Sequence, residues 1–474
     1  MQPGSRPPVG CFGQTLKLDK DLGEVNGRGW ELEAVAVVPS ERGGPAASPD
    51  SGAKTPPASP LFGILSAHMT PPPAPRRILH VDADAFFVAV ARMLDPDGAG
   101  KAPLLIVGGS PRGRGVVCSA SYETRAYGVR SAMPMSRAVR LCPAATVVPV
   151  PSGCGKKSRE VRGVLERFTP HVQGASIDEW YLDLAGMETL FAEPMEVTAR
   201  RIREAVRAET GLTVSIGGGS SKLIAKLAVE RAKPHKNPAA NGVFVVPAGD
   251  EIAFMSTLKL ADIPGIGPKS TERLARHSLI TVTDVLNADR AALVRAVGER
   301  EADWLAARAR GISESEVADK EQSKQMSRDE TFPRDLHDDR ALERELLRLA
   351  TRVAADLRGD GLTARTITVR IRDADWTNRS ASRTLPESVE SDRAIFTVAR
   401  ELLHKLRRAR RVPARLLSVS LSSLDEERRE IPQLALFDDV APMVETEKDR
   451  AVSHAVDRVR AKLGKDAIKP GGLV

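Results

Sequence analysis

The sequence predicts an α+β protein with several domains, and three observations support this fold class. Strand-like and helix-like segments alternate between residues 76 and 247, which indicates one mixed unit. Residues 248–312 instead read as short helices joined by Gly-rich turns. Residues 326–426 follow the order strand, helix, strand, strand, helix, strand. A length of 474 residues with 42% hydrophobic side chains allows a separate core in each unit.

The chain begins with a segment of different composition. Residues 1–75 are rich in Pro, Gly and Ser and contain runs such as TPPPAPRR. Such a segment has too little apolar area to offset the entropy that is lost on ordering. We therefore expect a disordered N-terminal extension before the first domain.

The mixed unit opens with ILHVDADAFFVAVARML, which reads as a short buried strand running into an apolar helix. The segments PLLIVGG and GVVCSASY follow as further strands. MEVTARRIREAVRAET has the period of an amphipathic helix, Gly211 is a stop signal, and LTVSIGGG is the next strand. The glycines of SIGGGSSK could suggest a phosphate loop, but a Gly-Lys-Ser/Thr sequence is absent there. A strand-to-helix turn is therefore the favoured interpretation.

A polar, charged stretch at residues 313–325 reads as the linker to the last domain. In the strand ARTITVRIR of that domain, alternate residues share a face. The apolar face holds Ile367, Val369 and Ile371. The polar face holds Thr366, Thr368, Arg370 and Arg372. Helices should cover the apolar face and leave the basic face to a partner or to solvent; Arg379 and Arg383 on the next strand favour a partner.

The chain is basic, with a formal net charge of +8 and a pI near 9.4. This charge suits a polyanionic partner, with nucleic acid the first candidate and a basic enzyme without such a partner the alternative. The four cysteines form no CxxC pair, which disfavours a zinc site or a disulfide framework and favours a reducing, cytoplasmic location. No stretch approaches the roughly 20 apolar residues of a membrane span.

Acidic residues interrupt two of the apolar strands. Asp82 and Asp84 follow the first strand, and Asp178 and Glu179 interrupt GASIDEWYLDL. Neighbours in a strand point to opposite faces, so the chain must turn at Asp178–Glu179 for both acids to reach one site. A hairpin bend there would meet this need. Clustered acids repel one another and lose hydration unless cations lie among them, and Mg²⁺ is the usual partner of such hard oxygen ligands.

Each of these motifs has another interpretation when taken alone. An Asp at the end of a strand is often a turn or cap residue rather than a metal ligand. The run VDAD also resembles the DxD loop of haloacid-dehalogenase-type phosphohydrolases. Phe86, however, stands where that loop has a Thr or Val, and no downstream Lys and paired-Asp motif completes the pattern.

Seven segments, in this order, resemble the Y-family DNA polymerases, and most closely the bacterial DNA polymerase IV (DinB-like) branch. They are HVDADAFF, GVVCSASYETRAYGVRSAMP, SIDEWYLDL, SIGGGSSKLIAKLAVERAKP, IPGIGPKS, ARTITVRIR and QLALF. The resemblance runs from about Arg77 to Phe437 and implies a right-hand polymerase with palm, fingers, thumb and a βαββαβ little finger. In these terms residues 76–247 are the palm with the fingers inserted at about 88–150, residues 248–312 the thumb, and residues 326–426 the little finger.

The resemblance also implies the chemistry. Asp82, Asp178 and Glu179 match the catalytic, metal-binding acids, with the Ala83 carbonyl as a further ligand. Two Mg²⁺ ions, for which Mn²⁺ could substitute, would activate the primer 3′-hydroxyl and hold the triphosphate during nucleotidyl transfer. The expected substrates are primer–template DNA and deoxynucleoside triphosphates.

Residues from several segments match the nucleotide-binding positions of the family. They are Phe86, Phe87, Tyr122, Arg125 and Lys233. Phe87 matches the steric gate, whose ring lies under the sugar and excludes a 2′-hydroxyl. Arg suits bidentate contact with a phosphate, and Lys acts as a point charge. A half-buried ring in the core is the alternative role for Tyr122.

Contacts to DNA and to a sliding clamp are implied outside the palm. IPGIGPKS resembles a helix–hairpin–helix motif, in which Gly265, Gly267 and Lys269 would approach a DNA phosphate at a helix N-terminus. The alternative is a simple tight turn between helices. In the tail at 427–474, Gln433, Leu434, Leu436 and Phe437 resemble the peptide at 433–437 by which bacterial polymerases dock on the beta clamp. We expect a monomer.

The sequence departs from the family pattern at two places near the site. Trp180 stands directly after the matched Glu, where the family usually has a small residue. The segment KPHKNPAANG, which begins at Lys233, is longer than the usual KPNG-like turn. The effect of either departure on the site does not follow from the sequence. Residues 448–463, beyond the resemblance, read as a further helix.

Two other classes of protein are alternatives to an active polymerase. A catalytically inactive clamp-binding scaffold would lack the acids, whereas Asp82, Asp178 and Glu179 are all present. A DNA-binding module or nuclease built on the helix–hairpin–helix alone would leave the SYETR and AKP segments without a role. The favoured hypothesis is a template-directed translesion DNA polymerase with low fidelity and low processivity, stimulated by the sliding clamp.

Overall fold

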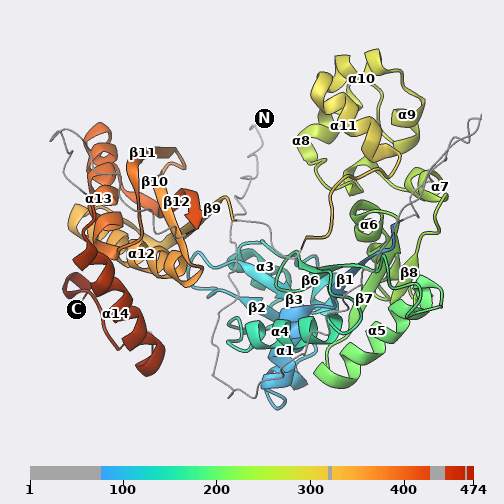
Figure 1. Ribbon diagram of the computed structural model, residues 1–474, viewed down its shortest axis with the longest axis horizontal. Helices are drawn as coiled ribbons and strands as arrows, with labels where there is room; N and C mark the ends of the chain where they lie inside the picture. The colour runs from blue at the N-terminus through green and yellow to red at the C-terminus, as the bar shows by residue number, and fades with distance from the viewer. Residues whose placement is uncertain (1–75, 319–322, 427–443, 465–466, 474) are drawn as a thin grey trace, which may run out of the picture.

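The computed structural model describes residues 76–318, 323–426, 444–464 and 467–473 (Figure 1). The expected extension at 1–75 and the peptide at 433–437 lie outside these residues. Within them the chain folds into units with separate hydrophobic cores. No helix in this described part is both long and apolar enough to cross a membrane.

A five-stranded sheet forms the centre of the first unit, with the strand order β5-β6-β1-β7-β8. Its strands are β1 (Ile78–Ala83), β5 (Val172–Gly174), β6 (Glu179–Asp183), β7 (Val214–Gly219) and β8 (Val243–Val245). β1 lies in the middle, antiparallel to both β6 and β7. The central strand β1 therefore lies between β6, which begins at Glu179 of the second acidic motif, and β7, which ends in the glycine run.

Period-two alternation divides the residues of β1 between the two faces of the sheet. Leu79, Val81 and Ala83 lie in the large core. Three helices contribute to this core: α1 (Phe86–Leu94), α4 (Cys154–Leu165) and α5 (Met195–Thr210). The opposite face carries His80 and Asp82 and is covered by α6 (Lys222–Ala232). Asp82, the first acid of the motif, is thus directed away from the main core.

Glycines in β7 allow α6 to approach the sheet closely. A Cβ added at Gly217 would lie 2.2 Å from both the Ala225 carbonyl oxygen and the Val229 amide nitrogen. Ser221 ends the intervening turn as the N-cap of α6, where its hydroxyl accepts a hydrogen bond from the Ile224 amide. The run SIGGGSSK is therefore a strand-to-helix turn, as the sequence interpretation favoured, and its glycines serve helix–sheet packing.

A three-stranded sheet is inserted between α1 and α4. Its strands are β2 (Leu105–Gly108), β3 (Val117–Ala120) and β4 (Thr146–Val148), in the order β3-β2-β4. Two short helices belong to it: α2 (Tyr122–Ala126) and α3 (Met135–Leu141). Its core is small and is built around Ile106, Val117 and Met135. This unit contributes α2 to the cavity described below.

The helical unit follows the five-stranded sheet. Its helices are α7 (Glu251–Ser256), α8 (Pro268–Ala275), α9 (Val282–Asn287), α10 (Arg290–Val297) and α11 (Glu299–Ala309), with a 3₁₀ turn at Leu260–Asp262. Its core includes Leu223, Ile224 and Leu227 of α6. Because α6 also packs on β1 and β7, the helical unit is anchored to the helix that covers the acidic face of the sheet.

The last unit has the predicted order of strands and helices. Its elements are β9 (Gln325–Leu336), α12 (Asp339–Gly359), β10 (Leu362–Asp373), β11 (Asn378–Val389), α13 (Asp392–Ala409) and β12 (Ala414–Glu426). The sheet order is β11-β10-β12-β9, and α12 and α13 cover one face of it (Figure 1). Ile367, Val369 and Ile371 of β10 are fully buried beneath these helices, as the alternation predicted.

A final helix, α14 (Glu447–Leu463), folds back on this unit, and it includes residues 448–463, which the sequence predicted to be helical. The buried Arg358 of α12 donates to the Asp457 carboxylate through Nε at 2.7 Å and pairs with Asp392 at 2.9 Å. The Glu445 carboxylate accepts from the Glu390 amide at 3.0 Å. These charge-assisted contacts attach the C-terminal helix firmly to α12 and α13.

The close packing of α6 on β7 generates a prediction about stability. Gly217→Ala should lower the free energy of unfolding by about 3 kcal/mol or more, because the new methyl group would overlap backbone atoms that cannot rotate away. Gly163→Ala is the matched control, since a Cβ at that position within α4 meets nothing within 4 Å. It should be neutral or slightly stabilising. Chemical denaturation of both variants checks this, and equal midpoints would contradict it.

Candidate active site

The register of β1 and β6 brings together the two acidic segments. Asp82 is the direct cross-strand partner of Glu179, so both side chains lie on the face of the sheet that α6 covers. The Ala83 amide donates to the Asp178 carbonyl at 2.9 Å, just beyond the end of the ladder. Acids that are far apart in the sequence therefore meet at one end of a strand pair.

Asp178 lies outside the strand, in the turn between β5 and β6. The turn is closed by the Ala175 amide, which donates to the Glu179 carbonyl at 2.9 Å. The Ser176 hydroxyl donates to the Asp178 carboxylate, and the Asp178 amide donates back to the same hydroxyl at 3.2 Å. Because Asp178 is free of strand alternation, it can share a site with Glu179. The structure has the hairpin bend that the adjacent acids require.

Burial disfavours ionisation of the two aspartates. It raises the pKa of Asp82 to about 6, and repulsion from Glu179 and Asp178 adds to the shift, while the nearby Lys233 opposes it. Burial also raises the pKa of Asp178, although the Ser176 hydrogen bond opposes this. The acids are therefore held together at an electrostatic cost, as is typical of functional sites.

Glu179 behaves differently from its neighbours. Burial opposes its ionisation, but His80 and Lys226 outweigh that effect and lower the pKa of Glu179 to about 2. The Lys226 ammonium lies 2.7 Å from Oε2, whereas His80 Nε2 is 3.6 Å away, too far for a normal hydrogen bond. Lys226 is therefore the stronger stabiliser of the Glu179 carboxylate.

A second lysine pairs with the first acid. Lys233 Nζ donates to Asp82 Oδ2 at 2.9 Å and to Glu230 Oε1 at 2.8 Å. Although burial favours the neutral amine, Asp82 and Glu230 raise the pKa of Lys233 above its ordinary value. Both lysines come from α6 or its C-cap, so the close approach of α6 to β7 also supplies the cations of the site.

A cavity of about 270 Å³ opens beside the acids. Asp82, Asp178 and Lys233 line it from the five-stranded unit, and Phe86 and Phe87 line it from α1. The two phenyl rings meet edge to face with centroids 5.4 Å apart. Phe87 is 8% exposed and Phe86 only 1%, so Phe87 is the more accessible of the two lining residues.

The helix α2 borders the same cavity with Tyr122 and Arg125. Ser121 caps α2 and fixes its start, because its hydroxyl accepts from the Thr124 amide. The Arg125 Nε donates to the Ala120 carbonyl at 2.9 Å, and its guanidinium carbon lies 5.4 Å from the centre of the Tyr122 ring. Burial raises the pKa of Tyr122 to about 12, so its hydroxyl remains protonated at neutral pH.

Among the residues that line the cavity and that the sequence interpretation did not name, His235 makes a ring contact. His235, in the long segment after Lys233, stacks on the Tyr122 ring with centroids 4.0 Å apart and an interplanar angle of 17°. The feature of the sequence that could have pointed to His235 is the unusual length of the segment after Lys233.

The other departure, Trp180, is only 2% exposed and packs in the main core, on the opposite face from Glu179. Strand alternation thus directs the indole away from the acids. Asp84, the remaining acid of the first motif, follows the end of β1 rather than continuing the strand. Its carboxylate accepts a hydrogen bond from Ser215 at 2.8 Å.

The acids have the donor chemistry of a magnesium site, with hard carboxylate and carbonyl oxygens. In the described part of the chain, no three His, Cys, Asp or Glu side chains are grouped as ready ligands. Here the carboxylates of Asp82 and Glu179 contact lysine ammonium groups. A divalent cation would replace these contacts, and it would offset the burial and the repulsion that together raise the pKa of Asp82.

Comparison with known proteins identifies the family. Residues 81–230 match the impB/mucB/samB family, and residues 323–436 match the C-terminal domain of that family. The chain is 33% identical over 397 residues to DNA polymerase IV of Dehalococcoides mccartyi (strain CBDB1), covering 84% of this chain and 97% of the relative. It belongs to the Y-family of DNA-directed DNA polymerases, in the DNA polymerase IV (DinB-like) group.

Further relatives agree with this assignment. DNA polymerase IV of Methanoculleus marisnigri is 37% identical over 354 residues, which cover 74% of this chain and 95% of the relative. A solved Y-family DNA polymerase chimera superposes with a TM-score of 0.65 at 26% identity, covering 74% of this chain and 99% of that one. An insertion ternary complex of Dbh DNA polymerase gives 0.52 at 25% identity, covering 73% and 98%. The predicted right-hand fold is thereby confirmed.

In the helical unit, the predicted glycines lie directly before α8. Gly265 has a φ of 99°, and a Cβ there would lie 2.9 Å from the Trp304 ring, so only glycine suits the position. Gly267 is the N-cap of α8 and has no side chain to cap it. Lys269 is exposed in the first turn of the same helix. The start of α8 thus has uncapped amide groups beside a lysine.

The C-terminal unit of β9 to β12 carries two of the predicted arginines on the sheet face that its helices leave open. Arg370 and Arg372 of β10 alternate with the buried aliphatic residues and are partly exposed. Arg370 pairs with Asp329 at 2.7 Å, and Arg372 Nε donates to Asn378 at 2.9 Å. Trp376, which the sequence interpretation did not single out, is 49% exposed in the β10–β11 turn, with Arg415 over its ring at 4.1 Å.

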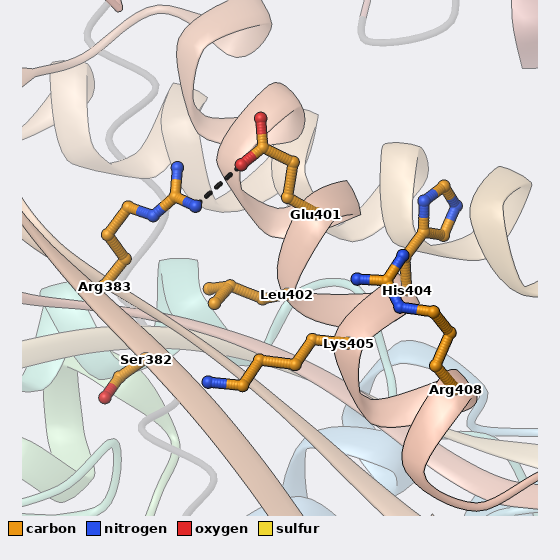
Figure 2. Close-up of a pocket in the computed structure, with 7 residues that line it drawn as sticks. All are labelled: Ser382, Arg383, Glu401, Leu402, His404, Lys405 and Arg408. Carbon is orange, nitrogen blue, oxygen red and sulfur yellow. Dashed lines mark ion pairs between the residues drawn. The ribbon is translucent and has the colours of Figure 1, made fainter.

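Arg379 and Arg383 do not lie on that open face, and the expectation that grouped them with it is wrong. In the register of β10 and β11, Arg379 is opposite Ile371 and Arg383 is opposite Ile367, so both share the helix-covered face. Arg379 pairs with the buried Asp373 at 2.8 Å. Figure 2 shows Arg383 directed toward Glu401 of α13, at 2.7 Å. Leu385, two residues after Arg383, is buried on the same face.

The opposite pKa shifts of Asp82 and Glu179 predict opposite effects on stability in the absence of metal. Ionised Asp82 destabilises the fold, a cost that is full above pH 6 and absent below its ordinary pKa of 3.8. Asp82→Asn should therefore raise the unfolding midpoint at about pH 8, with the gain vanishing near about pH 4. Thermal unfolding with a chelator present, at several pH values, measures this.

Glu179→Gln is the companion variant and should lower the midpoint. Ionised Glu179 contributes stability, which is present above its ordinary pKa of 4.5 and is lost as the pH falls toward 2. If the unfolding midpoint shifted in the same direction in both variants, the two carboxylates would not have opposite effects on stability.

Proposed function

We propose that this protein is a translesion DNA polymerase of low fidelity and low processivity, which extends a primer by two-metal-ion nucleotidyl transfer. One observation carries the proposal: Asp82, which lines a cavity together with Asp178 and Phe87, lies directly across from Glu179. Two Mg²⁺ ions, or Mn²⁺ in their place, would activate the primer hydroxyl and neutralise the triphosphate. Asp82, Asp178, Glu179 and the Ala83 carbonyl would hold them.

The chain's own side chains would hold the nucleotide. Lys233 reaches the cavity from the palm and Arg125 reaches it from α2, so a triphosphate would lie between cations from two units. The protonated Tyr122 hydroxyl is a further hydrogen-bond donor on the same side. Phe87 and Phe86 form the apolar floor on which a sugar would rest. Positioning of this kind accounts for most catalysis in phosphoryl transfer.

The size of the fingers supports low fidelity. The fingers consist of three short strands and two short helices, of which α2 has five residues and α3 has seven. Such a small unit offers little surface for checking the shape of a new base pair. Selection against a mismatch or a damaged base depends on contacts of this kind, so we expect the enzyme to accept distorted templates.

The thumb and the little finger would hold the DNA. Amide groups at the start of α8, after Gly265 and Gly267, are free to donate to a phosphate, and Lys269 adds a positive charge. Arg370 and Arg372 would contact the backbone from the open face of the little finger. Such contacts release counterions, so binding should weaken steeply as salt rises.

Three further parts of the proposal rest on the sequence alone. Residues 433–437 would dock on the sliding clamp and compensate for low processivity. We also propose a monomer that works in the cytoplasm, where replicating DNA and the clamp are found. A clamp-binding scaffold without activity is disfavoured, because it would not need Asp82 and Asp178 buried together at an electrostatic cost.

The acids generate the first prediction for activity. Replacing Asp178 and Glu179 together with Ala should reduce primer extension by at least about a thousandfold, because the metal ligands are lost. Binding to primer–template, measured by fluorescence anisotropy, should remain within about threefold, since the DNA contacts lie elsewhere. Glu188→Ala is a control on an exposed acid of the same unit. Unchanged extension by the double variant would remove these acids from the mechanism.

The steric gate generates the second prediction. Phe87→Ala should lower discrimination against ribonucleotides by at least about a hundredfold, because the space for a 2′-hydroxyl is no longer filled. The measurement is kcat/KM for a matched deoxy- and ribonucleotide pair. Phe86→Leu, at the more buried neighbour, should change this ratio far less. Equal ratios for Phe87→Ala and the unmodified enzyme would show that another residue acts as the gate.

A further inference from the structure

A pair of stacked rings connects the palm to the fingers at the nucleotide cavity. His235 belongs to the segment between α6 and β8, and Tyr122 is the first residue of α2. Their centroids are 4.0 Å apart and nearly parallel, and both side chains line the cavity beside the acids. This contact joins the two units directly where a triphosphate would lie.

The backbone of the segment holds His235 in place. The amides of Lys236 and Asn237 both donate to the Lys233 carbonyl, at 3.0 and 3.1 Å, and close a turn around His235. The Gly242 amide donates to the Ala232 carbonyl at 3.1 Å and closes the base of the whole segment. The turn that presents the imidazole therefore starts at Lys233, which already contacts Asp82.

His235 is not a core residue. It is exposed, and its ring rests on Tyr122, which is only partly accessible. Burial against that ring and the nearby charges of Lys233, Arg125 and Lys236 lower the pKa of His235, so the imidazole is neutral at physiological pH. A neutral ring can stack on the phenol without adding charge to the cavity. The ring contact with Tyr122 is thus made at the surface of the cavity and not within the core of the fold.

We propose that His235 is a positioning residue of the nucleotide site, which acts by stacking on Tyr122 and holding its phenol ready to receive the triphosphate of the incoming nucleotide. The inference rests on the proposed function, because it assigns Tyr122 to triphosphate binding. Without the stack, the Tyr122 side chain would have to be ordered at each binding event. Lost pre-organisation of this kind weakens binding of the nucleotide more than it slows the chemical step.

The test is steady-state primer extension by the full-length enzyme with a single deoxynucleoside triphosphate. His235→Ala should raise KM by about threefold to tenfold, the range expected for one aromatic pair, while kcat stays within about twofold. His235→Phe retains a ring that can stack and should restore KM to within about twofold of the unmodified value. Ala239→Ser, at an exposed position of the same segment that does not line the cavity, is the matched control and should leave KM unchanged.

A double substitution separates positioning from a general structural effect. Once Tyr122 is replaced by Leu, adding His235→Ala should leave KM unchanged, because the ring on which the imidazole acts is gone. The inference is overturned if His235→Ala leaves KM unaltered, if His235→Phe fails to restore it, if Ala239→Ser raises it equally, or if the substitutions at Tyr122 and His235 are additive. Absence of extension by the unmodified enzyme would instead refute the proposed function.

Discussion

The antiparallel register of β1 with β6 determines where the acids of the site lie. It sets Asp82 opposite Glu179, and both point to the face that α6 covers. A shift of one residue would direct Asp82 into the main core and bring Val81 to the site. The apolar residues that alternate with Asp82, among them Leu79 and Val81, are fully buried and prevent this shift. The hydrophobic core thus specifies the position of the charges.

The second constraint is the depth to which α6 packs on the sheet. The absence of a side chain at Gly217 lets the helix backbone come close to β7, and the lysines of the helix then reach the acids. Lys226 stabilises the charge on Glu179, whereas Asp82 remains costly to ionise even beside Lys233. A divalent cation bound beside Asp82 would stabilise the charge that is now costly to form. The close packing of α6 on the glycines of β7 is thereby linked to metal-dependent chemistry.

Two departures from the family pattern, which look equivalent in the sequence, have different consequences in the structure. Trp180 is adjacent to Glu179 but is directed into the core by strand alternation, so its bulk does not reach the acids. His235 is part of a lengthened loop, yet its imidazole stacks on Tyr122 of α2 beside the cavity. Distance along the chain is therefore a poor guide to which substitution modifies the site.

The sequence by itself determined the order of elements in the last domain and the identity of the acids, because hydrophobic period and short motifs are local properties of the chain. It did not determine on which face Arg379 and Arg383 lie, since that depends on the register across the turn between β10 and β11. Only the tertiary structure decided the contacts of Lys226 with Glu179 and of His235 with Tyr122. Each joins segments that are distant in the chain, and their meeting depends on how whole helices and sheets pack.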